Sequence, residues 1–204
     1  MKKGLFIVFE GIDGSGLTTN SKQITNWLNG LGIKAIYTKE PTMGKIGLLI
    51  REMLKDGADA YILTLLFTAD RSEHIKKEIL PKLEEGYLVI CDRYMYSTWA
   101  YQSIHGVKDS FIISLNKKFP KPDLVILLDV DPSIALKRKE GGKEIYENLD
   151  FLEKVRKKFL EIASDEGFIV IPTNRSIEEV QADIRKVMEY FLEEVGVLDA
   201  KKEN

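Results

Sequence analysis

Cysteine is nearly absent from this chain of 204 residues, which contains only Cys91. A single thiol excludes an internal disulfide framework and a cysteine-rich zinc site. Because Cys91 lies inside the apolar run 88–91, we interpret it as a small buried core residue.

Long apolar runs and basic stretches are also missing. No apolar run reaches the roughly 18 residues of a membrane span. The net charge of −2 and the lack of a long basic stretch argue against a nucleic-acid-binding domain, which usually carries a basic face. Residues 1–4 lack the small-residue cleavage site of a signal peptide, so we expect a cytoplasmic protein. The two histidines, His74 and His105, are interpreted as surface residues without a role.

Short apolar runs alternate with helical patterns along the whole chain. The last helical pattern places apolar residues from Ile177 to Val195 at three- and four-residue steps. Such alternation predicts one α/β domain over residues 1–204, with a five-stranded parallel sheet and helices on both faces. The predicted strands are residues 5–9, 35–38, 87–91, 124–130 and 168–171.

A glycine-rich loop follows the first predicted strand and reads Gly-Ile-Asp-Gly-Ser-Gly-Leu-Thr-Thr over residues 11–19. Its spacing and its place between a strand and a helix fit the phosphate-loop pattern, in which backbone N–H groups surround a phosphate. Thr18 would then give its hydroxyl to Mg²⁺. The pattern requires a lysine where Leu17 stands, so a tight turn without phosphate is the alternative interpretation.

Three further strings carry polar and aromatic residues. Glu40-Pro41 ends the second predicted strand, residues 66–74 read Leu-Phe-Thr-Ala-Asp-Arg-Ser-Glu-His, and residues 92–102 read Asp-Arg-Tyr-Met-Tyr-Ser-Thr-Trp-Ala-Tyr-Gln. Together with the glycine-rich loop, these strings resemble the thymidylate kinase family of P-loop nucleoside-monophosphate kinases over nearly the whole chain. The resemblance implies a P-loop NTPase fold with a small lid, transfer of the γ-phosphoryl group of ATP to dTMP, and a homodimer.

The resemblance also implies roles on the acceptor side. Arg93 would bind the dTMP phosphate, Phe67 would stack on thymine, and Arg71 would reach the thymine edge. Tyr101 would lie under the sugar and disfavour a 2′-hydroxyl, with Asp13 near the 3′-hydroxyl. The full set expected at dTMP is Asp13, Glu40, Pro41, Phe67, Arg71, Arg93, Ser97, Tyr101 and Gln102.

On the donor side, the resemblance implies Mg²⁺ near Thr18 and Asp92, partly through phosphates and water. The residues expected at ATP are Gly11, Asp13, Gly14, Ser15, Gly16, Leu17, Thr18, Thr19, Arg138 and Arg175. Those expected to act in catalysis are Asp13, Arg93, Arg138 and Lys143.

Structural interpretations of these residues remain open at the level of sequence. Phe67 and Tyr101 could simply pack in the core or on the sheet. Arg71 and Arg93 could pair with their neighbours Asp70 and Asp92, and Asp92 could cap the following turn.

The lid is expected near residues 137–148. Lids in the family usually carry arginine where this chain has Ile145, so two cationic positions are aliphatic. The remaining lid cations are Lys137, Arg138, Lys139 and Lys143; they are either a solvated face or the source of the charge missing at position 17.

Arg175, after the last predicted strand, would lie along adenine according to the resemblance. In the alternative interpretation, Ser176 caps the final helix and Arg175 is solvated.

Two further functions remain possible. A nucleotide-binding protein that has lost catalysis would account for Leu17 and Ile145. The other is a kinase for dUMP or for a deoxynucleoside: the Ala-Tyr-Gln string over residues 100–102 favours a deoxynucleotide acceptor but does not separate dTMP from dUMP.

Overall fold

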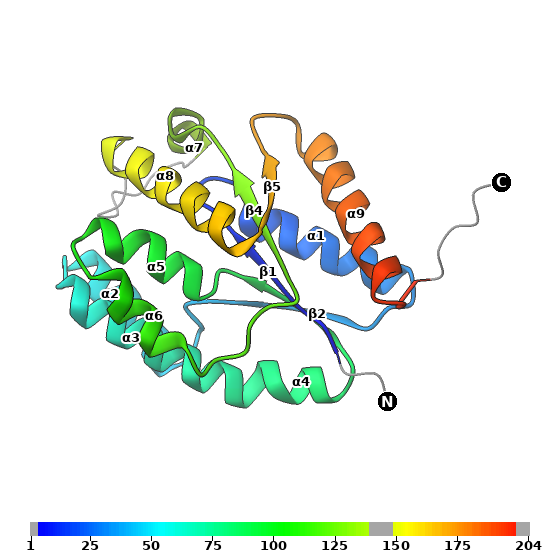
Figure 1. Cartoon of the computed structure of the whole chain (residues 1–204), viewed down its shortest axis with the longest axis horizontal. Helices are drawn as coiled ribbons and strands as arrows, with labels where there is room; N and C mark the ends of the chain where they lie inside the picture. The colour runs from blue at the N-terminus through cyan, green and yellow to red at the C-terminus, as the bar shows by residue number, and fades with distance from the viewer. Residues whose placement is uncertain (1–3, 139–148, 199–204) are drawn as a thin grey trace.

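The computed structural model describes residues 4–138 and 149–198. Five short strands form a single parallel sheet in the order β2-β3-β1-β4-β5 (Figure 1). The predicted α/β fold is confirmed, and the strand ends differ from the predicted ones by single residues. The strands are β1 (Phe6–Glu10), β2 (Ala35–Lys39), β3 (Leu88–Asp92), β4 (Leu124–Asp129) and β5 (Ile169–Pro172).

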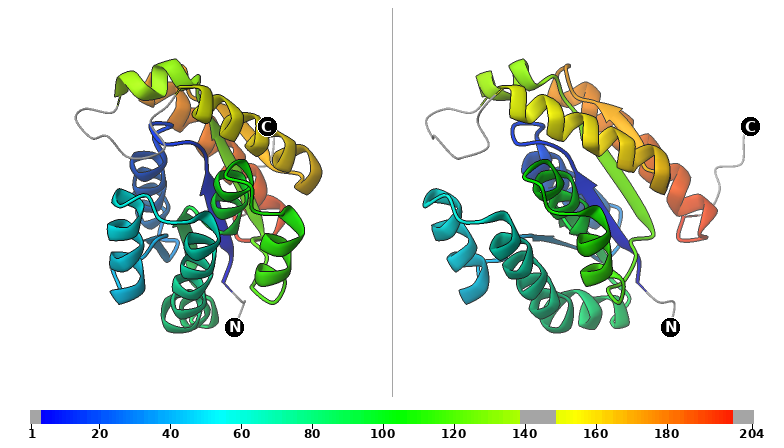
Figure 2. Two further views of the ribbon diagram at one scale, coloured as in Figure 1. Left: turned by 90° about the vertical axis from the view of Figure 1, so that its left-hand side faces the viewer. Right: turned by 60° about the vertical axis from the view of Figure 1, so that its left-hand side comes forward.

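Helices connect the strands and cover both faces of the sheet (Figure 2). In all views, α2 lies on the side of the molecule opposite α9. The helices are α1 (Leu17–Gly30), α2 (Lys45–Lys55), α3 (Ala60–His74), η1 (Ile75–Ile79), α4 (Leu80–Glu84), α5 (Met95–Ile104), α6 (Asp109–Asn116), α7 (Pro132–Arg138), α8 (Leu149–Glu166) and α9 (Ile177–Glu194). None of the helices in the described ranges is both long and apolar enough to cross a bilayer.

The core consists of two layers, one on each face of the sheet. Ile7 and Phe9 of β1 pack with the apolar faces of α1 and α9. Phe6 and Val8 point the other way and pack with residues of η1, α5 and α8. Because both faces are covered, the strands need apolar residues at successive positions, which explains their lack of alternation in the sequence.

The apolar stripe of α9 is shorter than the sequence pattern predicts. Val180, Ile184 and Met188 are buried against the sheet. Ile177 and Val195, at the two ends of the pattern, are 38% and 39% exposed. The stripe therefore packs against the core from Val180 to Leu192, and its first and last predicted residues lie outside that contact.

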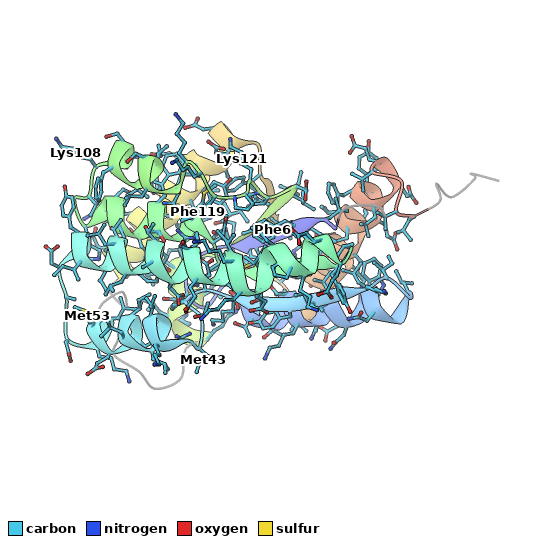
Figure 3. All side chains as sticks on the ribbon, turned by 90° about the horizontal axis from the view of Figure 1, so that it is seen from below. Phe6, Met43, Met53, Lys108, Phe119 and Lys121 are labelled. Atoms are coloured by element: carbon cyan, nitrogen blue, oxygen red, sulfur yellow. The ribbon has the colours of Figure 1, made fainter. Side chains whose placement is uncertain are left out.

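A single helical run extends from α3 through the π-helical turn η1 into α4, and it crosses the front of the view in Figure 3. Asp59 caps its start, since one carboxylate oxygen accepts hydrogen bonds from the backbone N–H groups of Tyr61 and Ile62. The run carries Phe67 and Arg71 towards the carboxyl end of β2.

Cys91 is a core residue, as expected. It is fully buried in the inner strand β3, and its Sγ donates a hydrogen bond to the carbonyl of Arg93 at 3.0 Å. Burial raises the pKa of the Cys91 thiol well above its usual value.

Parallel strands end at the same edge of the sheet. In the strand register Lys39 lies opposite Asp92, and Phe9 lies opposite Asp92 on the other side. The residues that follow these strands therefore meet at one edge, where open α/β sheets bind their ligands.

Candidate active site

The glycine-rich loop folds back at the start of α1. Gly14 and Gly16 have φ angles of +82° and +91°, which L side chains rarely adopt. Gly14 also touches α7, because a Cβ atom there would lie 2.5 Å from the carbonyl oxygen of Ala135. Glycine at position 14 thus lets the loop and α7 pack together.

Leu17 begins α1 and points into the protein. It is 6% exposed and belongs to the core cluster that includes Ile7 and Phe9. The side chain at this position therefore contributes packing and no charge.

Thr18 lies beside the carboxylate of Asp92, at the end of β3. Its hydroxyl donates to Asp92 Oδ2 at 2.6 Å, and the hydroxyl of Tyr37 donates to the same oxygen at 3.1 Å. The ammonium of Lys39 lies 3.7 Å from that oxygen and donates to Thr18 Oγ1 at 3.4 Å. Asp92 Oδ1 is buried and has no hydrogen-bond partner among the described residues.

A cavity of about 200 Å³ opens between α3, α5 and the ends of β2 and β3. Every residue that the sequence assigns to the acceptor nucleotide lines this cavity, although these residues come from separate parts of the chain. They are Asp13, Glu40, Pro41, Phe67, Arg71, Arg93, Ser97, Tyr101 and Gln102.

Arg71 is fully buried at the base of the cavity, although it carries a guanidinium. It donates from Nε to Glu40 at 2.8 Å, and from its terminal nitrogens to Asn116 at 2.6 Å and Thr98 at 3.0 Å. Asp70 does not pair with it and instead accepts hydrogen bonds from Thr42. A buried guanidinium held by three fixed acceptors is preorganised for recognition of a planar group.

His74 is buried, so its interpretation as a surface residue was wrong. Its ring lies 3.1 Å from Glu40, 2.7 Å from Thr38 Oγ1 and 3.5 Å from Glu78. Burial alone lowers the pKa of His74, but hydrogen bonds to Glu40 and Glu78 outweigh that effect and raise it from 6.5 to about 9. A charged His74 therefore fixes Glu40 from the side opposite Arg71. His105 is exposed, as expected.

Arg93 follows β3 with a φ angle of +72°, an uncommon conformation for a residue with a side chain. Its terminal nitrogens donate to Asp13 at 2.6 Å, to the carbonyl of Gly11 at 2.9 Å and to Ser97 at 3.0 Å. The guanidinium also lies over the ring of Tyr101, 5.6 Å from its centroid. The partner of Arg93 is thus Asp13, which links this cavity to the glycine-rich loop.

Glu10, at the end of β1, holds the backbone that positions Arg93. Its carboxylate accepts from the N–H groups of Tyr94 and Ser97 at 2.9 and 3.2 Å, and from the Ser97 hydroxyl at 2.5 Å. Burial raises the pKa of Glu10 from 4.5 to about 7, although the hydrogen bond from Ser97 and the charge of Arg93 oppose that rise.

The acceptor cavity meets a second depression over the glycine-rich loop. Asp13, Lys39 and Arg93 line both, so the two share one boundary that contains two cations and a carboxylate. Two phosphate-bearing ligands in these depressions would face each other across that boundary.

Arg138 and Arg175 lie near the ends of β4 and β5. Arg138 donates to the carbonyls of Gly14 at 3.4 Å and Thr173 at 2.7 Å, so it touches the glycine-rich loop. Arg175 donates to the carbonyl of Pro172 and to Asp183.

The helix α9 begins with the expected cap. Ser176 and Glu179 form a capping box, which confirms that part of the alternative interpretation of this loop. Lys139, Lys143 and Ile145 lie outside the described residues.

The match to known proteins extends over most of the chain. The family model for thymidylate kinase matches residues 9–184. The chain belongs to the thymidylate kinase family. A probable thymidylate kinase of Pyrobaculum aerophilum is 47% identical over 187 residues, which cover 90% of this chain and 95% of that protein. Those of Methanocaldococcus jannaschii and Archaeoglobus fulgidus are 49% and 44% identical, and the matches cover 90% and 92% of this chain and 95% and 96% of theirs.

Several site residues of this thymidylate kinase family member were not predicted from the sequence, among them Glu10, Lys39 and His74, and also Arg51, Leu54, Tyr94 and Thr98 of the cavity lining. Lys39 directly follows a predicted strand, and its place at the carboxyl end of that strand is the signal that would have identified it. Glu10 has the same kind of signal at the end of β1. His74 had none, because a lone histidine in a helix does not reveal which face is buried.

No group of three or more histidine, cysteine or carboxylate side chains that could hold a metal ion occurs within residues 4–138 and 149–198. The Thr18 hydroxyl and the Asp92 carboxylate nevertheless fit Mg²⁺, which prefers oxygen and usually takes few protein ligands beside phosphates and water. The buried, unpartnered oxygen of Asp92 is the group in this thymidylate kinase family site that such an ion would satisfy.

Proposed function

We propose that this protein is a dTMP kinase, which transfers the γ-phosphoryl group of ATP to dTMP and yields dTDP and ADP in dTTP biosynthesis. The observation that carries the proposal is the shared boundary of the two depressions at Asp13, Lys39 and Arg93. In-line transfer needs the donor and acceptor phosphates face to face, and this boundary provides that arrangement.

Recognition of thymine is assigned to the buried end of the acceptor cavity. Phe67 lines the cavity and offers an aromatic face for stacking, while Arg71 offers guanidinium donors to the base edge. The Oε1 atom of Gln102 is buried and has no hydrogen-bond partner in the described structure. A pyrimidine with an N–H at position 3, as in thymine or uracil, would satisfy that acceptor.

Phosphate and sugar recognition are assigned to the middle of the cavity. Arg93 binds the dTMP phosphate bidentately, with Ser97 beside it. Tyr101 is held in place, because its hydroxyl accepts a hydrogen bond from the Asp13 N–H at 3.1 Å. A fixed ring of that size leaves no room for a ribose 2′-hydroxyl, and Asp13 accepts a hydrogen bond from the 3′-hydroxyl.

ATP is assigned to the glycine-rich loop, with its phosphates on the backbone N–H groups and on the N-terminus of α1. Thr18 and Asp92 would hold Mg²⁺, which supplies charge neutralisation between the phosphates when bound. Glu40 and Pro41 complete the wall of the acceptor cavity.

The chemistry requires no protein nucleophile, since an oxygen of the dTMP phosphate attacks the γ-phosphorus directly and ADP leaves. Catalysis is therefore positioning and charge neutralisation. Arg93 and Asp13 orient the acceptor. We propose that Arg138 acts together with Lys143, which lies outside the described residues, in a lid near residues 137–148. Arg175 lies along the adenine ring. The whole chain, residues 1–204, is one kinase domain.

A homodimer is part of the proposal. Large apolar side chains are exposed on and next to α2 and α3: Met43 74%, Leu48 50%, Leu49 42%, Tyr61 43%, Ile62 45% and Leu65 51%. Met43 and Met53 mark the two ends of α2 in Figure 3. Exposed apolar patches of this kind favour a protein interface. Sedimentation of the wild type and of Leu65→Asp tests it, with a monomeric variant as the expected result. We place the protein in the cytoplasm, where both substrates occur.

A second candidate is a nucleotide-binding protein without catalysis, which the burial of Leu17 favours. A turnover assay separates the two: purified protein with ATP, Mg²⁺ and a panel of dTMP, dUMP, UMP and thymidine. ADP production that depends on dTMP supports the kinase. ADP production with dUMP or thymidine alone would mean that the kinase acts on that substrate instead of dTMP. No ADP above background with any acceptor would support the nucleotide-binding protein without catalysis.

A further inference from the structure

The phosphate loop of this chain carries no cation. Residues 11–19 contain neither lysine nor arginine, and Leu17 is buried where the loop pattern has its lysine. In a site that excludes water, the charge on a transferring phosphoryl group must face cations or oriented donors. A cation from another element is therefore required near the start of α1.

Lys39 is such a cation. It is the last residue of β2 and lies opposite Asp92 in the strand register. Its ammonium is 3.4 Å from Thr18 Oγ1 and 3.7 Å from Asp92 Oδ2, and Lys39 lines the depression over the phosphate loop. The ammonium therefore reaches across from β2 to the first turn of α1.

We propose that Lys39 replaces the missing phosphate-loop lysine, and that its ammonium binds the phosphates of ATP. The inference rests on the proposed ATP site over residues 11–19. In this arrangement the positive charge comes from Lys39 on β2 instead of from a lysine at position 17, and Leu17 packs in the core.

Charge balance within the site supports assignment to the donor. Arg93 faces the acceptor cavity with its charge partly balanced by Asp13 at 2.6 Å, and Arg71 is balanced by Glu40 at 2.8 Å. Lys39 has a looser contact with its carboxylate, and its side chain is 41% exposed. Such an ammonium on a flexible stem reorients readily onto a phosphate.

Arg138 is less well placed to supply this charge. Its guanidinium donates to the carbonyls of Gly14 and Thr173, which are fixed backbone acceptors on the α7 side of the loop. Lys39, in contrast, contacts Thr18 itself, the residue whose hydroxyl approaches the metal and phosphates in the loop pattern.

The test is a double-mutant cycle of Lys39→Met and Leu17→Lys. Three quantities are measured for each variant: the affinity for ATP by calorimetric titration in EDTA, the affinity for dTMP alone by calorimetric titration, and kcat. Lys39→Met removes the charge and keeps the length of the stem. We expect it to weaken ATP binding roughly ten- to hundredfold, to lower kcat about hundredfold and to leave dTMP affinity within about threefold.

Leu17→Lys should then rescue the Lys39→Met variant by at least about tenfold in ATP affinity, yet add little to the wild type. A lysine at position 17 that turns out of the core towards the phosphates, as in the phosphate-loop pattern, would serve the same phosphates as Lys39, so the two effects should be non-additive. Lys34→Met is the matched control, because Lys34 is exposed at the opposite end of β2 and lines neither depression; all three readouts should stay at the wild-type value.

Two results would overturn the inference. Lys39→Met could weaken dTMP binding and leave ATP binding intact, which would make Lys39 an acceptor-side residue. Alternatively, a folded Lys39→Met/Leu17→Lys protein could show no rescue. If Lys39→Met does not fold, Lys39→Arg decides: retained ATP affinity supports the inference, and a loss greater than about tenfold contradicts it. Because ATP binding is measured without turnover, these results stand apart from the assay of the kinase reaction.

Discussion

Raising the pH above about 9 should remove the charge on His74 and so weaken its contact with Glu40, the carboxylate that holds Arg71 in the acceptor cavity. His74 is charged at neutral pH because Glu40 and Glu78 raise its pKa from 6.5 to about 9. In the unfolded chain these contacts are absent. The difference contributes about 3 kcal/mol to the free energy of unfolding.

The direction follows from the raised pKa. The contribution is fully present below pH 6.5 and is lost as the pH rises to about 9, since the folded state then no longer binds the extra proton. Urea unfolding of the wild type and of His74→Gln at pH 6 and pH 9.5 measures it. The stability advantage of the wild type should fall by about 3 kcal/mol between the two values.

The comparison between the two proteins cancels the other titrating groups, including Glu10. The raised pKa of Glu10 makes stability fall with rising pH between 4.5 and about 7 in both proteins. The affinity for dTMP should weaken over the same range as the stability advantage, because Glu40 holds Arg71. An advantage of His74 that is equal at both pH values would refute the argument that the histidine is charged.

Three other substitutions test assigned roles. Arg93→Ala should weaken dTMP binding by on the order of 2–5 kcal/mol and leave ATP affinity within a few-fold; equal calorimetric losses for both nucleotides would mean a structural role. Tyr101→Ala should raise kcat/KM for ribonucleoside monophosphates relative to dTMP, and an unchanged ratio would contradict the role of the ring in sugar selection. Ser176→Ala should lower the free energy of unfolding by about 1 kcal/mol through loss of the cap, with turnover unchanged; a large loss of activity would bring this loop into the site.

The strands, and the set of residues that line the cavity between α3 and α5, could be predicted from the sequence. Runs of apolar residues mark strands covered on both faces, and the motif around Arg93 and Tyr101 identifies the residues that line the cavity. The structure adds which charges pair. Arg93 reaches Asp13 across the sheet edge instead of its neighbour Asp92, because a left-handed residue redirects the chain after β3.

The charge network beneath the cavity could not be predicted. Glu40, just after β2, meets Arg71 and His74, which lie three residues apart near the end of α3, and a sequence pattern does not reveal that this face of the helix is buried. The position of Lys39 after a predicted strand places it at the edge of the sheet, but its contact with Thr18 could not be predicted, because the two residues lie on different elements and no motif links them.

The single thiol of Cys91 allows local opening of the sheet at β3 to be measured by thiol labelling. Its Sγ is buried in β3 and bonded to the carbonyl of Arg93, so a thiol reagent reaches it only when the sheet separates at that point. Because no other thiol exists in the chain, the labelling rate in native buffer measures one event. A nucleotide that binds Arg93 and stabilises the closed sheet should slow labelling as its concentration rises, which gives a binding signal without an engineered cysteine.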